Sequence, residues 1–221
     1  MKKFVYLIAS IINSGITALL LYMSPYVILP MHYGINGNAD RYASKWEIMI
    51  YTLFPIVISI IYLIYSIIIE KKNSKNQKVM DKIFFIGFVY IFVILWYMMA
   101  LSLQCKPHLS NSYFAMFAVI MGVMLMLMSN FIPKARQNNF FGIRIKATLS
   151  SQTTWNKTHR LAGVLGIIGS LALMICGILG VIFESIVVYL FLSGIGIYFI
   201  LGVIIPCIYA NVIAKKEKNN G

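Results

Sequence analysis

The chain has 221 residues, of which 60% are hydrophobic and only 11% charged, and its mean hydropathy is +0.83. An ordinary soluble domain carries about 25% charged residues, so a water-soluble fold would lack the polar groups to cover this chain, and lipid is expected to be its main solvent. The net charge of +13 lies in short blocks between apolar runs, which is the pattern of membrane-protein loops and disfavours direct nucleic-acid binding.

Apolar runs predict six transmembrane helices. The first run is too long for the apolar region of a signal peptide, and Pro55 is expected to bend the second helix. The stretch 161–209 is too long for one span and has a single charged residue, so it is expected to fold back at Glu184–Ser185. The predicted spans are about 4–28, 47–69, 83–103, 112–132, and two more within 161–209.

The distribution of Lys and Arg predicts the orientation of these spans. With the N-terminus inside, 16 of the 19 basic residues fall in cytoplasmic segments, and only Arg41, Lys45 and Lys106 fall outside. We therefore expect an all-α polytopic protein of the bacterial plasma membrane, with six transmembrane helices and both termini cytoplasmic. Residues 1–70 would form a two-helix module, and residues 71–221 a four-helix module with a cytoplasmic loop at 133–160.

Four polar residues of the first span, Ser10, Asn13, Ser14 and Thr17, fall on one helical face. Such a stripe usually faces neighbouring helices, and it can instead line a ligand path. Pro206 is expected to kink the last span. The three cysteines show no paired spacing, so neither a disulfide framework nor a zinc site is expected.

The outer loop 30–46 contains His32 and Asp40 on either side of an Asn36-Gly37-Asn38 turn. The histidine and the aspartate could pair with each other or bind a ligand at the membrane surface. Two such side chains make a weak metal site, because zinc usually takes three or four protein ligands. A self-capped loop at the mouth of the bundle is an equally good interpretation.

The inner loop is the longest polar interruption of the chain. Ser150 or Ser151 can cap a short helix in which Trp155 and His159, four residues apart, share one face. Arg144 and Arg160 offer forked donors for carboxylate or phosphate, including anionic lipid head groups. Three glycines follow at spacings of three, Gly163, Gly166 and Gly169, and predict close contact between helices.

Familiar catalytic signatures are absent from the sequence. It has no P-loop, no HExxH and no serine elbow, and no Asp or Glu lies deep within a predicted span. Ion-coupled transporters usually need such an intramembrane group, so ion-coupled pumps and familiar hydrolases are disfavoured. We expect no catalysis, no cofactor and no metal.

Two stretches resemble the SdpI-like family of bacterial membrane proteins. The outer one carries Pro-x-His and resembles the family's Asn-x-x-Gly-x-x-Asp-Arg pattern, although the glycine here directly follows the asparagine. The inner one carries N-x-x-x-G-I-R, T-L-S and W-x-x-T-H-R-x-x-G. Where the family often has Thr-Pro-Trp after the arginine, this chain has Ile145, Lys146 and Ala147. The residues that carry the resemblance are Pro30, His32, Asn36, Gly37, Asp40 and Arg41, then Asn138, Gly142, Ile143, Arg144, Thr148, Leu149, Ser150, Trp155, Thr158, His159, Arg160 and Gly163.

The resemblance implies immunity against a secreted toxic peptide that is met at the outer face. It also implies a receptor function, in which the toxin-occupied protein holds a cytoplasmic transcriptional repressor at the membrane. Two alternatives stay open: a transporter or lipid-handling protein that uses the stripe of the first span, and a membrane enzyme acting on a phosphorylated lipid through His159 and Arg160. The candidate binding residues are His32, Asn36, Gly37 and Asp40 outside, and Asn138, Gly142, Arg144, Thr148, Trp155, His159 and Arg160 inside.

Overall fold

The computed structural model describes residues 4–70, 74–110, 112–138 and 141–219. Within these residues, six helical segments are long and apolar enough to cross a membrane, as expected. Only 11–33% of each apolar window is buried inside the structure, so most of these side chains need a lipid environment. The chain is therefore a multi-pass membrane protein. Its orientation remains a prediction, and Lys2, Lys3, Lys71 and Lys72, which contributed to it, lie outside the described residues.

Contacts divide the chain into two compact units. Unit 1 comprises residues 1–74 and 87–110, and unit 2 comprises residues 75–86 and 111–221. Helix α3, Ser74–Leu103, contributes to both of them. The modules 1–70 and 71–221 that the sequence suggests remain a prediction, because these units describe packing alone.

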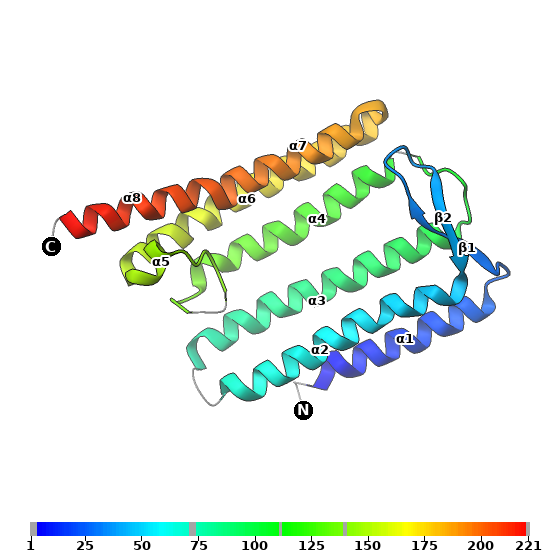
Figure 1. Cartoon of the computed structure of the whole chain (residues 1–221), viewed down its shortest axis with the longest axis horizontal. Coiled ribbons are helices and arrows are strands. Elements are labelled where there is room, and N and C mark those ends of the chain that lie inside the picture. The colour runs from blue at the N-terminus through cyan, green and yellow to red at the C-terminus, as the bar shows by residue number, and fades with distance from the viewer. Residues whose placement is uncertain (1–3, 71–73, 111, 139–140, 220–221) are drawn as a thin grey trace. The chain divides into compact units, whose positions relative to one another are not determined.

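Unit 1 begins with helix α1, Val5–Met23, which lies beside α2, Ile48–Glu70 (Figure 1). The first helix was expected to continue to residue 28, and that expectation is wrong. Pro25 disfavours helical backbone at Ser24, whose N–H instead closes the last turn on Leu20 and Leu21. The α2 helix continues through Pro55, where the bend stays a prediction, and the Ser59 hydroxyl donates to the Pro55 carbonyl at 2.7 Å.

The outer loop contains a β-hairpin that was not predicted. Strands β1, Ile28–Tyr33, and β2, Ala39–Ser44, pair antiparallel. The register shifts on both sides of His32, so Met31 and Asp40 have no direct partner across the hairpin. Such bulges re-aim side chains. Met31 enters a core with Leu21, Leu29, Ile48 and Met99, whereas Asp40 turns to the exposed side.

The polar stripe of α1 is buried, as the spacing of its residues indicates. Ser10, Asn13 and Thr17 lie on the inner face of unit 1. The Ser10 and Ser59 hydroxyls are 3.0 Å apart and join α1 to α2, and Trp96 Nε1 of α3 donates to Asn13 Oδ1 at 2.8 Å. Hydrogen bonds therefore connect all three helices of this unit.

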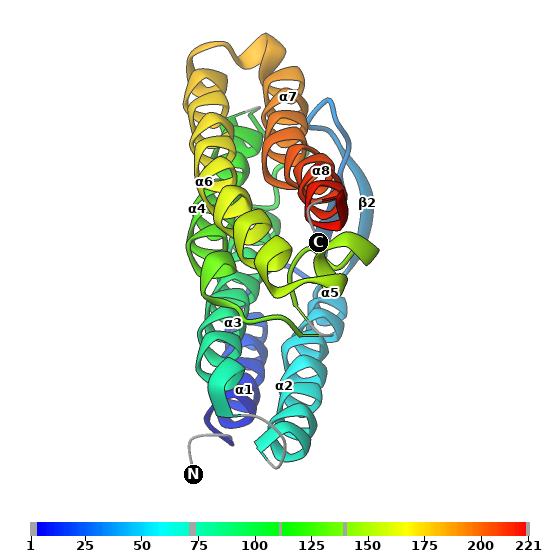
Figure 2. The same cartoon turned by 90° about the vertical axis from the view of Figure 1, so that its left-hand side faces the viewer.

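In unit 2, helix α4, Ser112–Phe131, packs on α6, Gln152–Ile182, and α6 packs on α7, Val187–Phe199 (Figure 2). A 3-10 turn, Glu184–Ile186, joins α6 and α7 at the predicted position. A π-helical turn, Ile200–Ile204, then leads into α8, Ile205–Asn219. The short helix α5, Lys146–Ser150, lies against both α6 and α8.

The glycines of α6 permit these close contacts, as predicted. A methyl group on Gly163 would overlap Pro133, and one on Gly166 would overlap the Ser129 side chain of α4. A methyl group on Gly169 would come within 2.8 Å of the Tyr198 Cα atom in α7. Small residues at these positions let the helix backbones approach, which favours association where lipid gives no hydrophobic drive.

Candidate functional site

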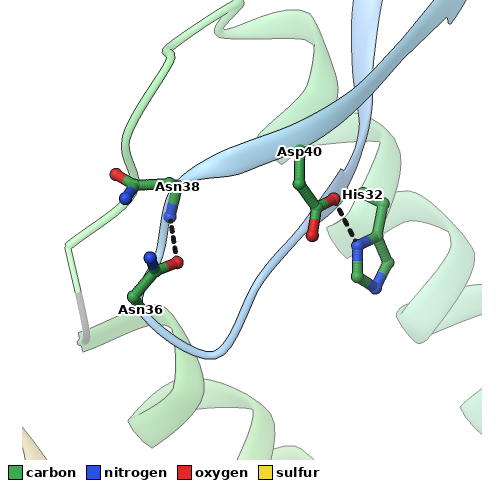
Figure 3. Close-up of polar contacts among 4 residues, drawn as sticks. All are labelled: His32, Asn36, Asn38 and Asp40. Atoms are coloured by element: carbon green, nitrogen blue, oxygen red, sulfur yellow. Dashed lines mark hydrogen bonds and ion pairs between the residues drawn. The ribbon is translucent and has the colours of Figure 1, made fainter.

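His32 and Asp40 pair on the hairpin, which is one of the alternatives that the sequence leaves open. The His32 Nδ1 atom donates to Asp40 Oδ1 at 2.6 Å, and both side chains are exposed (Figure 3). The bulge at Asp40 aims its carboxylate across the strand at the imidazole. An exposed pair of this kind contributes at most about 1 kcal/mol to stability, so both groups remain available to a ligand.

The tip of the hairpin is held by polar contacts. Asn36 Oδ1 accepts from the Asn38 N–H at 3.1 Å, which closes an Asx turn (Figure 3). Gly37 has a φ of +79°, and a side chain there would overlap the Leu109 carbonyl. The tip of the hairpin is thus in close contact with Leu109, in the segment that follows α3.

That segment, residues 104–110, completes the outer motif and was not predicted to take part in it. His108 Nδ1 donates to Asn38 Oδ1 at 2.9 Å, and the Leu109 N–H donates to the Gly37 carbonyl at 2.9 Å. The Tyr33 hydroxyl donates to the Lys106 carbonyl at 3.0 Å. No short-range sequence pattern links positions about 70 residues apart, so sequence reasoning missed these contacts.

Two other charged side chains at the hairpin, Arg41 and Lys45, have hydrogen-bond partners. Arg41 forms an ion pair with Glu47, and Lys45 Nζ donates to the Ser24 carbonyl at 2.8 Å. The hydrogen bond that Arg41 donates to Glu47 raises the pKa of Arg41 above its ordinary value, with a further contribution from Tyr51. Arg41 is thus compensated by Glu47 and His32 faces Asp40, whereas the Lys45 ammonium meets a neutral carbonyl.

A cavity of about 280 Å³ lies in unit 1 between α1, β1, the start of α2 and the end of α3. Asn13 and Thr17 line it, as the ligand-path hypothesis for the stripe requires, and His32 contributes from the hairpin. Ser10 does not line the cavity, and its hydroxyl lies 3.0 Å from that of Ser59. The stripe is thus packed at one end and open to the cavity at the other.

The inner motif is built on Trp155 and His159, which share one face of α6 as predicted. Their rings stack with centroids 3.9 Å apart, and both residues are fully buried. Trp155 Nε1 donates to the Ala135 carbonyl at 2.8 Å, and this contact ties α6 to the end of α4. The helix that carries them is not short: Ser151 caps α6, which continues from Gln152 into the fifth span.

His159 holds the preceding loop through both ring nitrogens. Nδ1 donates to the Trp155 carbonyl at 2.8 Å, and Nε2 accepts from the Ile143 N–H at 3.0 Å. An imidazole that donates at one nitrogen and accepts at the other is neutral. Gly142 has a φ of +105° and lies so close to His159 that no side chain fits there.

Thr148 and Asn138 shape the rest of the loop. Thr148 Oγ1 accepts from the Ile145 N–H at 3.1 Å and donates to the Ile143 carbonyl at 2.7 Å. Asn138 Oδ1 accepts from the Phe141 N–H at 2.8 Å. The predicted Phe140 contribution lies outside the described residues.

The residues predicted for the inner site thus fall into two groups. Gly142, Thr148, Trp155 and His159 make internal contacts that shape the loop, whereas Arg144 and Arg160 are exposed. Because both nitrogens of His159 are engaged, the enzyme hypothesis lacks a free acid–base group at this position. The exposed guanidinium groups are the part of this motif that can meet an anionic partner.

The end of α8 also contacts this region, which the sequence did not indicate. Thr154 Oγ1 donates to Glu217 Oε2 at 3.1 Å, and α5 packs between the two helices (Figure 2). Across the described residues, no three His, Cys, Asp or Glu side chains converge as metal ligands.

Comparisons with known proteins agree with the resemblance. Residues 134–210 match the SdpI/YfhL protein family, and this segment contains the inner motif and most of α6 to α8. The chain is 25% identical to the immunity protein SdpI of Bacillus subtilis (strain 168) over 177 residues, which are 80% of this chain and 79% of that protein. No solved structure matches the chain. The chain is therefore similar to the SdpI/YfhL family within residues 134–210 and to an SdpI immunity protein over most of its length.

Proposed function

We propose that this protein confers immunity against a secreted killing peptide, which it meets at the hairpin of unit 1. The observation that supports this is the likeness to an immunity protein over 80% of the chain, well beyond the segment 134–210. The exposed His32–Asp40 pair and the adjoining cavity provide a polar contact and an apolar one within a single unit. The charge distribution predicts that this end of unit 1 lies outside the cell, where a secreted peptide arrives.

Survival of a toxin-sensitive bacterium tests the proposal. Cells that express the wild type are challenged with a panel of killing peptides, beside cells that express His32→Ala or Arg144→Ala at equal membrane abundance. Tyr42→Phe on the same hairpin and Lys146→Ala beside the arginine are the matched controls, because both residues are exposed. We expect protection by the wild type and the controls, and a loss of protection with His32→Ala. A well-expressed wild type that protects against no peptide contradicts the proposal.

The finer part of the proposal is signalling through the inner motif. Arg144 and Arg160 are exposed, and they would meet a cytoplasmic repressor that presents acidic side chains. A fluorescent fusion of each candidate repressor should move to the membrane only when protein and peptide are both present. It should stay in the cytoplasm with Arg144→Ala, and recruitment that is unchanged in this variant contradicts the assignment.

A further inference from the structure

The cavity of unit 1 contains buried polar groups that the fold does not use. Thr17 and Ser102 are 3% and 8% exposed, and their hydroxyls have no hydrogen-bond partner among the described residues. The Asn13 carboxamide accepts from Trp96, but its NH2 group also lacks a partner within that part of the chain. Buried polar groups are normally hydrogen-bonded, so these three require an explanation.

These groups open on the cavity and are not sealed in the core. Among the described residues, Thr158 Oγ1 is the only fully enclosed side-chain N or O atom without a partner, and it lies in unit 2. The polar atoms of Asn13, Thr17 and Ser102 therefore reach open space, and all three residues line the cavity. They are placed to bond whatever fills it.

The other residues that line the cavity favour an aromatic ligand. Methionines 31, 98 and 99 contribute to the wall together with Trp96 and Tyr51. Thioether sulfur makes favourable contacts with aromatic rings, and flexible methionines adapt to the shape of a ligand. A cavity of about 150 Å³ holds benzene, so the 280 Å³ found here has room for a substituted or two-ring aromatic group.

The charges at the rim indicate that the occupant is neutral. Among the lining residues His32, Tyr51 and Met98 are exposed, and His32 pairs with Asp40. Arg41 beside them is matched by Glu47. A charged ligand would find no uncompensated partner at this entrance, and an ion inside the apolar wall would lose its hydration.

We propose that this cavity binds a neutral aromatic group with one hydrogen-bonding atom, supplied by a tyrosine or tryptophan side chain of the killing peptide. The source of the group rests on the proposed function, whereas its chemistry rests on the cavity alone. The ring packs among the methionines, and its O–H or N–H bonds the polar groups of Asn13, Thr17 and Ser102. The hairpin above the cavity holds the peptide backbone beside His32.

The test uses the purified full chain with p-cresol and 3-methylindole as probes, and toluene as the apolar comparison. We expect saturable binding of both polar probes, with p-cresol bound about fivefold more tightly than toluene because each neutral hydrogen bond adds about that factor. Thr17→Val keeps the shape of the side chain, removes its hydroxyl and should reduce this preference. Ser66→Ala, a buried serine of α2 outside the cavity, should leave it unchanged.

A second variant, Ser102→Leu, fills the cavity and should weaken probe binding by about tenfold or more, with an unfolding temperature checked beside the wild type. In the survival assay, it should also remove protection. Absence of probe binding to a folded wild type overturns the cavity site even if the protein protects cells. Full protection by a folded Ser102→Leu protein would show that the killing peptide does not supply the aromatic group. Recovery of a lipid acyl chain from the cavity would show the same. Probe binding by a wild type that protects against no peptide supports the aromatic site and sets aside the immunity proposal.

Discussion

Replacing Gly142 with alanine should destabilise unit 2 more than any other single methyl addition in the inner loop. The residue has a φ of +105°, and an added Cβ would overlap His159 Nε2 and come within 3.3 Å of Trp155 Cη2. A positive φ costs a non-glycine residue roughly 1–2 kcal/mol. Displacing His159 also breaks the bond from the Ile143 N–H, and an unsatisfied buried donor costs about 1–3 kcal/mol.

The two costs together give about 2–5 kcal/mol. For a chain of this size, each kcal/mol lowers the unfolding temperature by about 2–4 °C, so we expect a decrease of about 4–20 °C in detergent solution. Gly196→Ala in α7 is the matched control, because no atom lies within 4 Å of its added Cβ. That variant should be neutral or slightly stabilising, since alanine is the better helix former.

Equal unfolding temperatures for Gly142→Ala and Gly196→Ala would refute the reasoning. They would mean that the loop moves away from His159 without loss. A decrease in Gly142→Ala that persists when His159 is also replaced by alanine would assign the cost to the backbone φ alone.

Three further predictions concern other contacts. Trp155→Phe should cost about 1–3 kcal/mol in thermal unfolding, because the Ala135 carbonyl loses its buried donor; no change would mean that water replaces the indole. Glu217→Ala removes a partly exposed hydrogen bond and should cost less than about 1 kcal/mol, and a larger loss would show that α8 organises the loop. With the native cysteines replaced, Ile35→Cys should react with an impermeant maleimide in intact cells and Lys157→Cys only after lysis; the reverse pattern would invert the orientation.

The sequence predicts the membrane class and the number of spans because both depend on local composition. Apolar runs and the single break at Glu184 suffice for the six helices. The error at the end of α1 has a local cause, since the hydropathy of residues 24–28 resembles that of the helix while Pro25 ends it. Hydropathy indicates whether a segment lies in lipid or in water. Where a helix ends also depends on residues such as Pro25 that disfavour helical backbone.

The hairpin was missed because its strands do not alternate in the manner of a half-buried sheet. Bulges at Met31 and Asp40 interrupt the two-residue period, and the tip is completed by His108 from a distant segment. The candidate residues themselves were named from spacing and resemblance, and the structure brings His32 to Asp40 and Trp155 to His159. Asn13 and Thr17 reach the cavity because of how α1, α2 and α3 are placed in space. No pattern along the chain predicts that placement.

The π-helical turn at residues 200–204 sets the rotational phase of everything that follows it. A π turn accommodates about one residue more than an α-helix of the same rise, and one residue corresponds to about 100° of rotation. Because of this extra residue, α8 is rotated so that Ala210 and Ile213 are buried and Glu217 contacts Thr154. Converting residues 200–204 to a regular α-helix without a deletion would rotate α8 by about 100° and turn that face away from α6, whereas deleting one of these residues would leave the face where it is. The π-helical conformation of this short segment therefore decides which side chains the C-terminal helix presents to the inner loop.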